Sequence, residues 1–295
     1  MKPLSVLILS DKSSGSSVLQ RELARHSAIK TMRRPPHQEG ETLFWSKAAA
    51  LFDLPQPPMI DSTLLPMSRH RAHGDIASLL ADNLTQSVGV PETREQLFDV
   101  WRLLTLEYAP VFLEKSPHHL HNRAVLELVL EASARLRDVE FRFVGLVRNP
   151  VDTLYSMWKR WRTVPEARAG EWCRAYGNLL WLSDEAPDLT RVVRYEDLVA
   201  DPAEMRDLLD FLGLQPESAV GDEFHRGSLG AWRNDPHFGY QPDLQLRALA
   251  LEFGYPPDEV ENRPSGWWPV EREVWSRGRR VRTRAGSIWR GLSRR

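Results

Sequence analysis

The chain has 295 residues, of which 42% are hydrophobic, and this length suffices for one large α/β domain or two modest ones. Its net charge of −1 gives no overall attraction to nucleic acid or to membranes. Cys173 is the only cysteine, which excludes an intrachain disulfide and a cysteine metal cluster. The first apolar run, residues 4–9, is too short for a signal-peptide core or a membrane span, so we expect a cytoplasmic protein.

Four short apolar runs predict buried parallel strands. Each run is followed by polar or turn residues and then by a helical pattern, and this alternation is typical of a doubly wound α/β fold. Ligands of such folds bind at the carboxyl ends of the strands, so the loops after these runs are the candidate site. The runs are residues 4–9, 111–113, 141–147 and 191–195.

Three helices are indicated between and after these strands. One is expected near residues 42–52, within the proline-rich and less regular stretch 33–70. A second has Pro91 in its expected first turn, where proline is favoured. A third begins at the Asp-Pro pair 201–202 and ends at Gly213, because glycine is a common helix stop.

The end of the chain is strongly basic. Residues 277–295 contain eight arginines and no acidic residue. One interpretation is a solvated terminal segment, and another is a surface for peripheral contact with anionic lipid or a polyanionic acceptor. Since no linker divides the rest of the chain, we expect a single domain over residues 1–275 and a basic tail over 276–295.

The loop after the first strand has the composition of an anion site. Small residues between a strand and a helix expose backbone N–H groups, and the helix N-terminus adds positive potential. The alternative is a plain glycine-serine turn. A Walker A loop is excluded because Gly15 is followed by Ser16 and not by lysine, which argues against a magnesium–ATP enzyme. The candidate anion-binding residues are Lys12, Ser13, Ser14, Gly15, Ser16 and Ser17.

A second candidate anion site follows the third apolar run. Arg148 ends that run, and Ser156 lies eight residues later, in the expected next helix. The alternative is an arginine that caps a strand end together with an ordinary helical serine. Two separate anion sites predict a ligand with two separated anionic groups.

These residues resemble the sulfotransferases that use 3′-phosphoadenosine 5′-phosphosulfate (PAPS). The family's 5′-phosphosulfate loop is similar to residues 12–17, with one extra serine between Lys12 and Ser14. Its 3′-phosphate motif, Arg-Asx-Pro followed by a serine eight residues after the arginine, is similar to Arg148-Asn149-Pro150 and Ser156. The resemblance implies a three-layer α/β sandwich with a central parallel sheet, the P-loop NTPase-like sulfotransferase fold.

Three further segments extend the resemblance over about half the chain, in the family's order. Residues 194–202 look like the family's Tyr-Glu-Asp strand end, which would place Tyr195 near the adenine. Residues 224–234 look like the loop that closes on the 3′-phosphate, and this assigns Arg226 and Gly227 to that group when one residue is dropped next to the arginine. Residues 113–120 resemble the Glu-Lys-Thr-Pro segment of carbohydrate and protein sulfotransferases.

The resemblance also implies the catalytic groups. Lys12 and Lys115 are the candidates for stabilising the bridging oxygen and the sulfuryl group, and the chain has only six lysines. The histidine that serves as base in small-phenol members is replaced here by Pro117. Other members use a glutamate in the segment after the first helix, and Gly40-Glu41-Thr42 looks like the Glu-Thr stretch of the protein-tyrosine type. The resemblance therefore ranks Glu41 first as general base, Glu39 second and His118 third. The histidine clusters lack paired carboxylates at ligand spacing, so no metal site is expected.

The sequence thus predicts a sulfotransferase that moves a sulfuryl group from PAPS to a hydroxyl or amine, with PAP as product and no metal. The acceptor is expected to be a carbohydrate, a glycolipid or another complex metabolite, and not nucleic acid. Two alternatives stay open: a P-loop kinase or nucleotide hydrolase, and a non-catalytic module that binds PAP.

Overall fold

The computed structural model describes residues 2–60, 62, 64–217, 220–221, 224 and 226–262. The basic segment 277–295 lies outside these residues. The chain falls into two compact units, which are described separately. The first comprises Met1–Arg148 and Arg174–Arg226, and the second comprises Asn149–Cys173 and Gly227–Arg295. The expectation of one domain over residues 1–275 stays a prediction.

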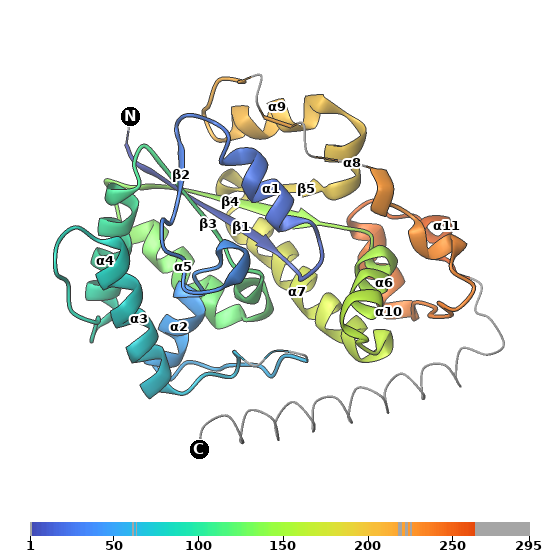
Figure 1. Cartoon of the computed structure of the whole chain (residues 1–295), viewed down its shortest axis with the longest axis horizontal. Helices are drawn as coiled ribbons and strands as arrows, with labels where there is room; N and C mark the ends of the chain where they lie inside the picture. Colours follow the sequence, from blue (N-terminus) through green and yellow to red (C-terminus); the bar gives the residue numbers. More distant parts are fainter. Residues whose placement is uncertain are drawn as a thin grey trace, which may run out of the picture. The chain divides into compact units, whose positions relative to one another are not determined.

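The first unit is built on a five-stranded parallel sheet of order β2-β3-β1-β4-β5 (Figure 1). All seven residues of the central strand are buried, as expected for a strand with neighbours on both edges and helices on both faces. The strands are β1 (Leu4–Ser10), β2 (Ile29–Thr31), β3 (Val111–Lys115), β4 (Glu140–Val147) and β5 (Thr190–Arg194).

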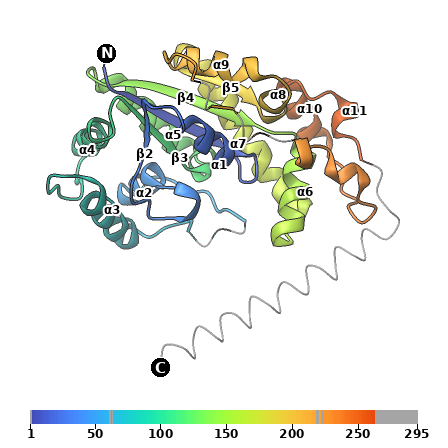
Figure 2. The same ribbon diagram turned by 45° about the horizontal axis from the view of Figure 1, so that its top comes forward.

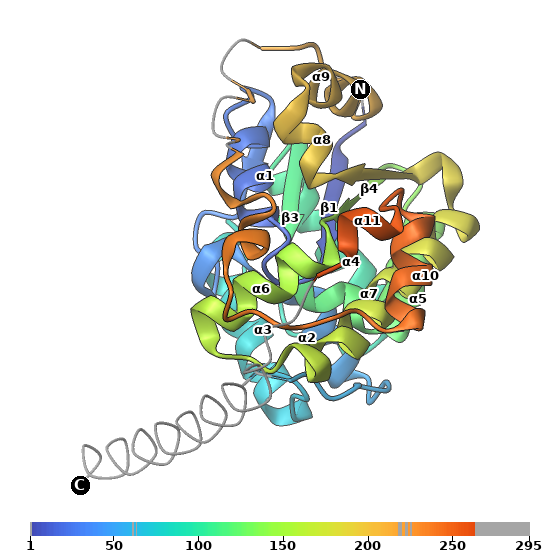
Figure 3. The same ribbon diagram turned by 90° about the vertical axis from the view of Figure 1, so that its right-hand side faces the viewer.

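Helices cover both faces of this sheet. Parallel strands joined by right-handed crossovers place a helix on one face when the chain moves one way along the sheet and on the other face when it returns. Accordingly α1 (Ser16–Leu23) lies on one face, and α4 (Arg94–Glu107) and α5 (Arg123–Arg135) lie on the other (Figures 2 and 3). The remaining helices assigned to this unit are η1 (Gln38–Gly40), α2 (Phe44–Leu51), α3 (Arg69–Asn83), η2 (Pro117–His121), η3 (Pro187–Leu189), α8 (Tyr195–Ala200) and α9 (Pro202–Phe211).

The predicted elements are confirmed with two corrections. The four apolar runs are strands, but β5 ends at Arg194, so Tyr195 begins α8 and is not a strand residue. Pro91 precedes its helix, because Thr93 is the N-cap and its hydroxyl accepts the N–H of Gln96 at 3.2 Å. The stretch predicted to be irregular does contain α2, as expected, and ends at the start of α3.

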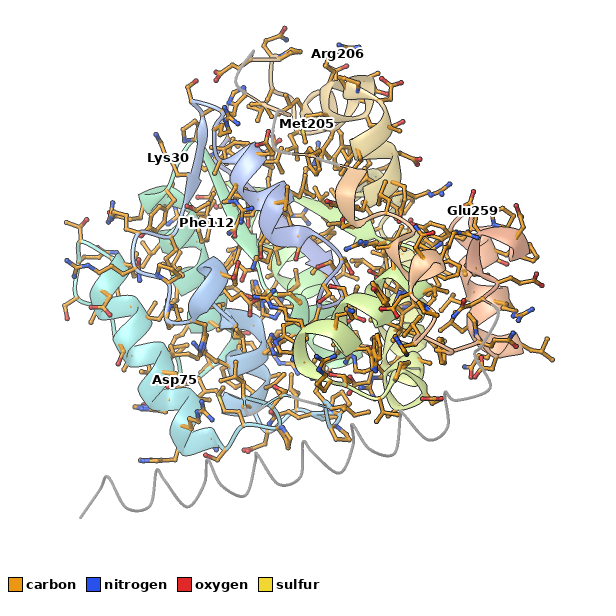
Figure 4. The ribbon with its side chains drawn as sticks, turned by 45° about the vertical axis from the view of Figure 1, so that its right-hand side comes forward. Lys30, Asp75, Phe112, Met205, Arg206 and Glu259 are labelled. Atoms are coloured by element: carbon orange, nitrogen blue, oxygen red, sulfur yellow. The ribbon has the colours of Figure 1, made fainter. Side chains whose placement is uncertain are left out.

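The edge strand β2 was not predicted. It has only three residues, and the exposed Lys30 at its centre interrupts any apolar run (Figure 4). Its strand conformation comes from pairing with β3, where Ile29 lies opposite Val111.

The second unit is helical. It contains α6 (Pro150–Trp161), the first part of α7 (Pro165–Glu185), η5 (Ala231–Asn234), α10 (Leu244–Glu252) and α11 (Pro257–Val260), and η4 (Arg226–Ser228) begins at its boundary. Asn149 caps α6 by accepting the N–H of Val151 at 2.9 Å, and Asp152 in the first turn accepts the N–H of Gly230 at 2.9 Å. In the part of the chain that the structure describes, no helix has the length and apolarity of a membrane span.

Candidate functional site

The loop between β1 and α1 (residues 11–15) adopts a backbone that only a few residue types allow. Ser13 and Gly15 have φ angles of 62° and 93°, in the region that residues with a Cβ rarely occupy. A Cβ on Gly15 would lie 2.4 Å from ring atoms of Tyr195. Glycine is therefore required here, since Tyr195 packs directly against the backbone at the start of α1.

Buried polar side chains hold this β1–α1 loop in place. Asp11 Oδ1 accepts the N–H of Lys12 at 2.7 Å and lies 2.8 Å from Nε2 of His121. Ser14 Oγ lies 2.9 Å from the hydroxyl of Tyr176, which also donates to the carbonyl of Leu146 at 3.1 Å. Burial, followed by the nearby Asp11 carboxylate, raises the pKa of Tyr176, so its hydroxyl stays a donor.

Arg148, at the end of β4, reaches the same loop. It is 6% exposed, its guanidinium donates to the carbonyl of Ser13 at 3.1 Å, and it lies 5.0 Å from the centroid of the Tyr195 ring. The structure therefore brings together Arg148, the β1–α1 loop and Tyr195, which the sequence had assigned to one ligand.

The other predicted 3′-phosphate residues are not brought together with Arg148 by the described contacts. Ser156 lies half-buried on α6, and Gly227 is exposed, but both belong to the second unit. The backbone of Arg226 forms the first residue of η4, and its side chain lies outside the described part. The roles of Ser156, Arg226 and Gly227 stay predictions.

Lys115 connects the loop region to the first base candidate. The register places it at the carboxyl end of β3, opposite Ile8 of β1. Its side chain is fully buried, and Nζ donates to the carbonyl of Glu39 at 2.8 Å and to Ser17 Oγ at 3.3 Å. The same Nζ lies 3.3 Å from Glu41 Oε1. The Lys115 ammonium thus contacts both a hydroxyl at the start of α1 and the Glu41 carboxylate. Lys115 and Glu41 are 74 residues apart in sequence.

The three base candidates have different surroundings. Burial raises the pKa of Glu41, and the Lys115 ammonium opposes this rise only in part, so its carboxylate is a stronger base than an exposed glutamate. Nδ1 of His118 lies 3.6 Å from Glu41 Oε2. Burial lowers the pKa of His118 well below its ordinary value, so the imidazole is neutral. The side chain of Glu39 is exposed, and the contact of Glu39 with Lys115 is made by its backbone carbonyl.

Acid is expected to destabilise the fold through the half-buried His37. Burial, assisted by Lys47, lowers the pKa of His37 to about 4, so the folded state binds fewer protons than the unfolded state between pH 6.5 and 4. The stabilisation is complete above the unfolded pKa and is lost as the pH falls towards 4, and because solvent screens this half-buried group the loss from His37 is about 1–2 kcal/mol. Urea unfolding at several pH values measures this. His37→Gln should flatten the slope, whereas the exposed His70→Gln should not, and an unchanged slope in His37→Gln would contradict the assignment.

The comparison with protein families identifies the chain. The model of the sulfotransferase family matches residues 5–218. The chain belongs to this family. No curated protein matches it in sequence.

Solved sulfotransferases share its fold. The sulfotransferase domain from the curacin biosynthetic pathway aligns with a TM-score of 0.57 at 19% identity, over 86% of this chain and 98% of that domain. The sulfotransferase domain of the Synechococcus PCC 7002 olefin synthase aligns with a TM-score of 0.57 at 20% identity, over 85% of this chain and 94% of that domain. At these identities the likeness establishes the fold.

The sequence did not predict the residues that hold the β1–α1 loop of this sulfotransferase. Asp11, His121 and Tyr176 carry no motif signal, because their partners are 110 and 162 residues distant in sequence. His121 could have been singled out within the histidine cluster only by knowing that η2 packs against β1. Among the described residues, no three His, Cys, Asp or Glu side chains are grouped as metal ligands.

Proposed function

We propose that this sulfotransferase uses PAPS as donor and sulfates a hydroxyl, or an amine, of a carbohydrate, a glycolipid or another complex metabolite. The observation that carries the proposal is the position of Lys115, whose ammonium contacts both Ser17 at the start of α1 and the Glu41 carboxylate. In this arrangement a cation, a helix N-terminus and a carboxylate lie within one small region, which supports the proposal.

The β1–α1 loop and its neighbours fit the donor. Backbone N–H groups at the start of α1, with Lys12, would hold the 5′-phosphosulfate. Arg148 would pair with the 3′-phosphate, and the ring of Tyr195 beside it offers an apolar face for the adenine. The sequence resemblance alone supports the same role for Ser156, Arg226 and Gly227.

The proposed reaction is a direct in-line transfer. Glu41 takes the proton of the acceptor hydroxyl, and the acceptor oxygen forms a bond to sulfur. The bond between sulfur and the bridging oxygen breaks, and its electron pair stays on the 5′-phosphate of PAP. Lys115 and Lys12 stabilise the negative charge that gathers on the bridging and equatorial oxygens.

A groove on the first unit supports a sizeable polar acceptor. It has a volume of about 430 Å³, and its lining includes Ser17 and Glu39, two of the three residues that contact Lys115 Nζ. Its lining mixes polar and apolar side chains, which suits an acceptor with hydroxyl groups and apolar faces. The other lining residues are Gln20, Arg21, Ala24, Thr31, Met32, Arg33, Pro35 and Gly40.

Calorimetric titration with PAP, compared with ATP plus magnesium, tests the donor. We expect PAP to bind without magnesium and to bind more tightly than ATP. Arg148→Ala should weaken PAP binding by about 10- to 100-fold, the value of one charge-assisted phosphate contact. Arg142→Ala is the matched control, because Arg142 lies on β4, the strand that precedes Arg148, and contacts Phe211.

Two outcomes, one of this titration and one of a PAPS turnover assay, would contradict the proposal. Binding of ATP only with magnesium would indicate a P-loop kinase or nucleotide hydrolase. Tight PAP binding without turnover of PAPS by any acceptor would indicate a non-catalytic PAP-binding module.

A further inference from the structure

The turn that carries Glu41 has an unusual backbone. Glu39, Gly40 and Leu43 have φ angles of 60°, 74° and 50°. Two of these three residues carry a Cβ, and such residues rarely adopt the left-handed conformation. Contacts from outside the turn must therefore select this conformation.

The carboxylate of Glu114 supplies the central contact. Its side chain is fully buried, and Oε1 accepts the hydroxyl of Thr42 at 2.6 Å and the hydroxyl of Ser116 at 2.5 Å. Ser116 Oγ in turn accepts the backbone N–H groups of Thr42 at 3.2 Å and Leu43 at 2.9 Å. One buried carboxylate thus fixes both the side chain and the backbone of the residue next to Glu41.

A buried lysine holds the other side of Thr42. Nζ of Lys47, on the first turns of α2, donates to the carbonyl of Thr42 at 2.8 Å. Lys47 is 0% exposed, and burial lowers its pKa to about 8. Together these contacts occupy the N–H, the carbonyl and the hydroxyl of Thr42, so this residue has little freedom to move.

The carboxyl end of β3 connects these contacts to the candidate site. Glu114 and Lys115 are consecutive on β3, and consecutive side chains of a strand point to opposite faces. Lys115 contacts Ser17 and the Glu41 carboxylate, whereas Glu114 contacts Thr42. The end of β3 therefore holds residue 41 by its carboxylate and residue 42 by its hydroxyl.

We propose that Glu114, with Thr42, Ser116 and Lys47, forms a positioning network that holds the Glu41 carboxylate in place for proton transfer. This inference rests on the proposed function, because it assumes that Glu41 is the general base. Glu114 and Thr42 are positioning residues and do not touch the reacting atoms.

Two variants of Thr42, one without the hydroxyl and one that keeps it, test the network. Thr42→Val removes the hydroxyl that donates to Glu114 and keeps the shape of the side chain. We expect kcat to fall by about 10- to 100-fold, with little change in the Kd of PAP, and we expect Thr42→Ser to restore kcat. The rate is measured as release of PAP from PAPS with the best acceptor from a panel of phenols, simple sugars and a galactolipid.

Two controls separate positioning from general loss of structure. Thr105→Val removes another fully buried hydroxyl, which donates to the Trp101 carbonyl on α4, and it should leave kcat unchanged. In the Glu41→Gln background, Thr42→Val should lower kcat by less than about threefold, since a residue that acts through Glu41 loses its effect when the base is absent.

The outcome that overturns the network is an unchanged kcat in Thr42→Val, or an equal loss of kcat with and without Glu41. If the wild-type protein releases no PAP from PAPS, the proposed function fails. The network is then tested by crystal structures of the two Thr42 variants. If the turn of residues 39–43 is displaced in Thr42→Val but not in Thr42→Ser, the network is supported. If the turn does not move in either variant, the network is overturned.

Discussion

Replacing Glu41 with glutamine is expected to lower kcat by about 10²- to 10⁴-fold, the usual contribution of a positioned general base. Glutamine keeps the shape of the side chain and can still face Lys115, but it cannot accept a proton at neutral pH. The Kd of PAP should change little. Steady-state rates of PAPS turnover and calorimetric titration with PAP measure the two quantities.

The pH dependence of the rate gives a second signature of Glu41. A general base must be deprotonated, so kcat/KM should rise with pH through the pKa of Glu41 and then level off. Burial raises that pKa above its ordinary value, and Lys115 opposes the rise, so the ascending limb should lie above the pH range of an exposed glutamate. Glu41→Gln should remove this limb.

Variants of the other candidates show which group is the base. Glu39→Gln alters an exposed side chain in the same turn and should cost far less than Glu41→Gln. His118→Asn removes the imidazole that lies 3.6 Å from Glu41 and should have an intermediate effect. A larger loss in either variant than in Glu41→Gln would transfer the role of base to that residue.

Replacing Lys115 with methionine is expected to lower kcat by about 10²- to 10³-fold, comparable to the loss of one oxyanion-hole donor. The fully buried ammonium is aligned before the reaction, so its stabilisation of developing charge requires little reorganisation. The loss should appear mainly in kcat, because charge on the bridging oxygen grows only as the bond to sulfur breaks.

The same variant should move the pH profile. Lys115 lowers the pKa of Glu41 against the effect of burial, so Lys115→Met should shift the ascending limb to higher pH. Lys30→Met is the control for the loss of one positive charge, since Lys30 lies exposed on β2 at the edge of the sheet (Figure 4). A profile that does not move would show that Lys115 and Glu41 are not coupled.

The sequence by itself determined the parts of the molecule whose signals are local. Buried strands appear as continuous apolar runs, and so β1, β3, β4 and β5 could be predicted with nearly correct bounds. The β1–α1 loop and Arg148 could be assigned to one site, because residues at the carboxyl ends of neighbouring parallel strands meet at the same edge of a sheet.

Only the tertiary structure decided the features that depend on partners distant in the chain. The three residues of β2 form a strand because β3 supplies their hydrogen bonds. Lys115 was predicted from its motif, but its contact with Glu41 spans 74 residues, and the buried hydrogen bond between Glu114 and Thr42 spans 72. In the sequence Glu114 is one acidic residue at a strand end. Folding removes its carboxylate from water, and a buried charge must then find hydrogen-bond donors wherever the fold brings them.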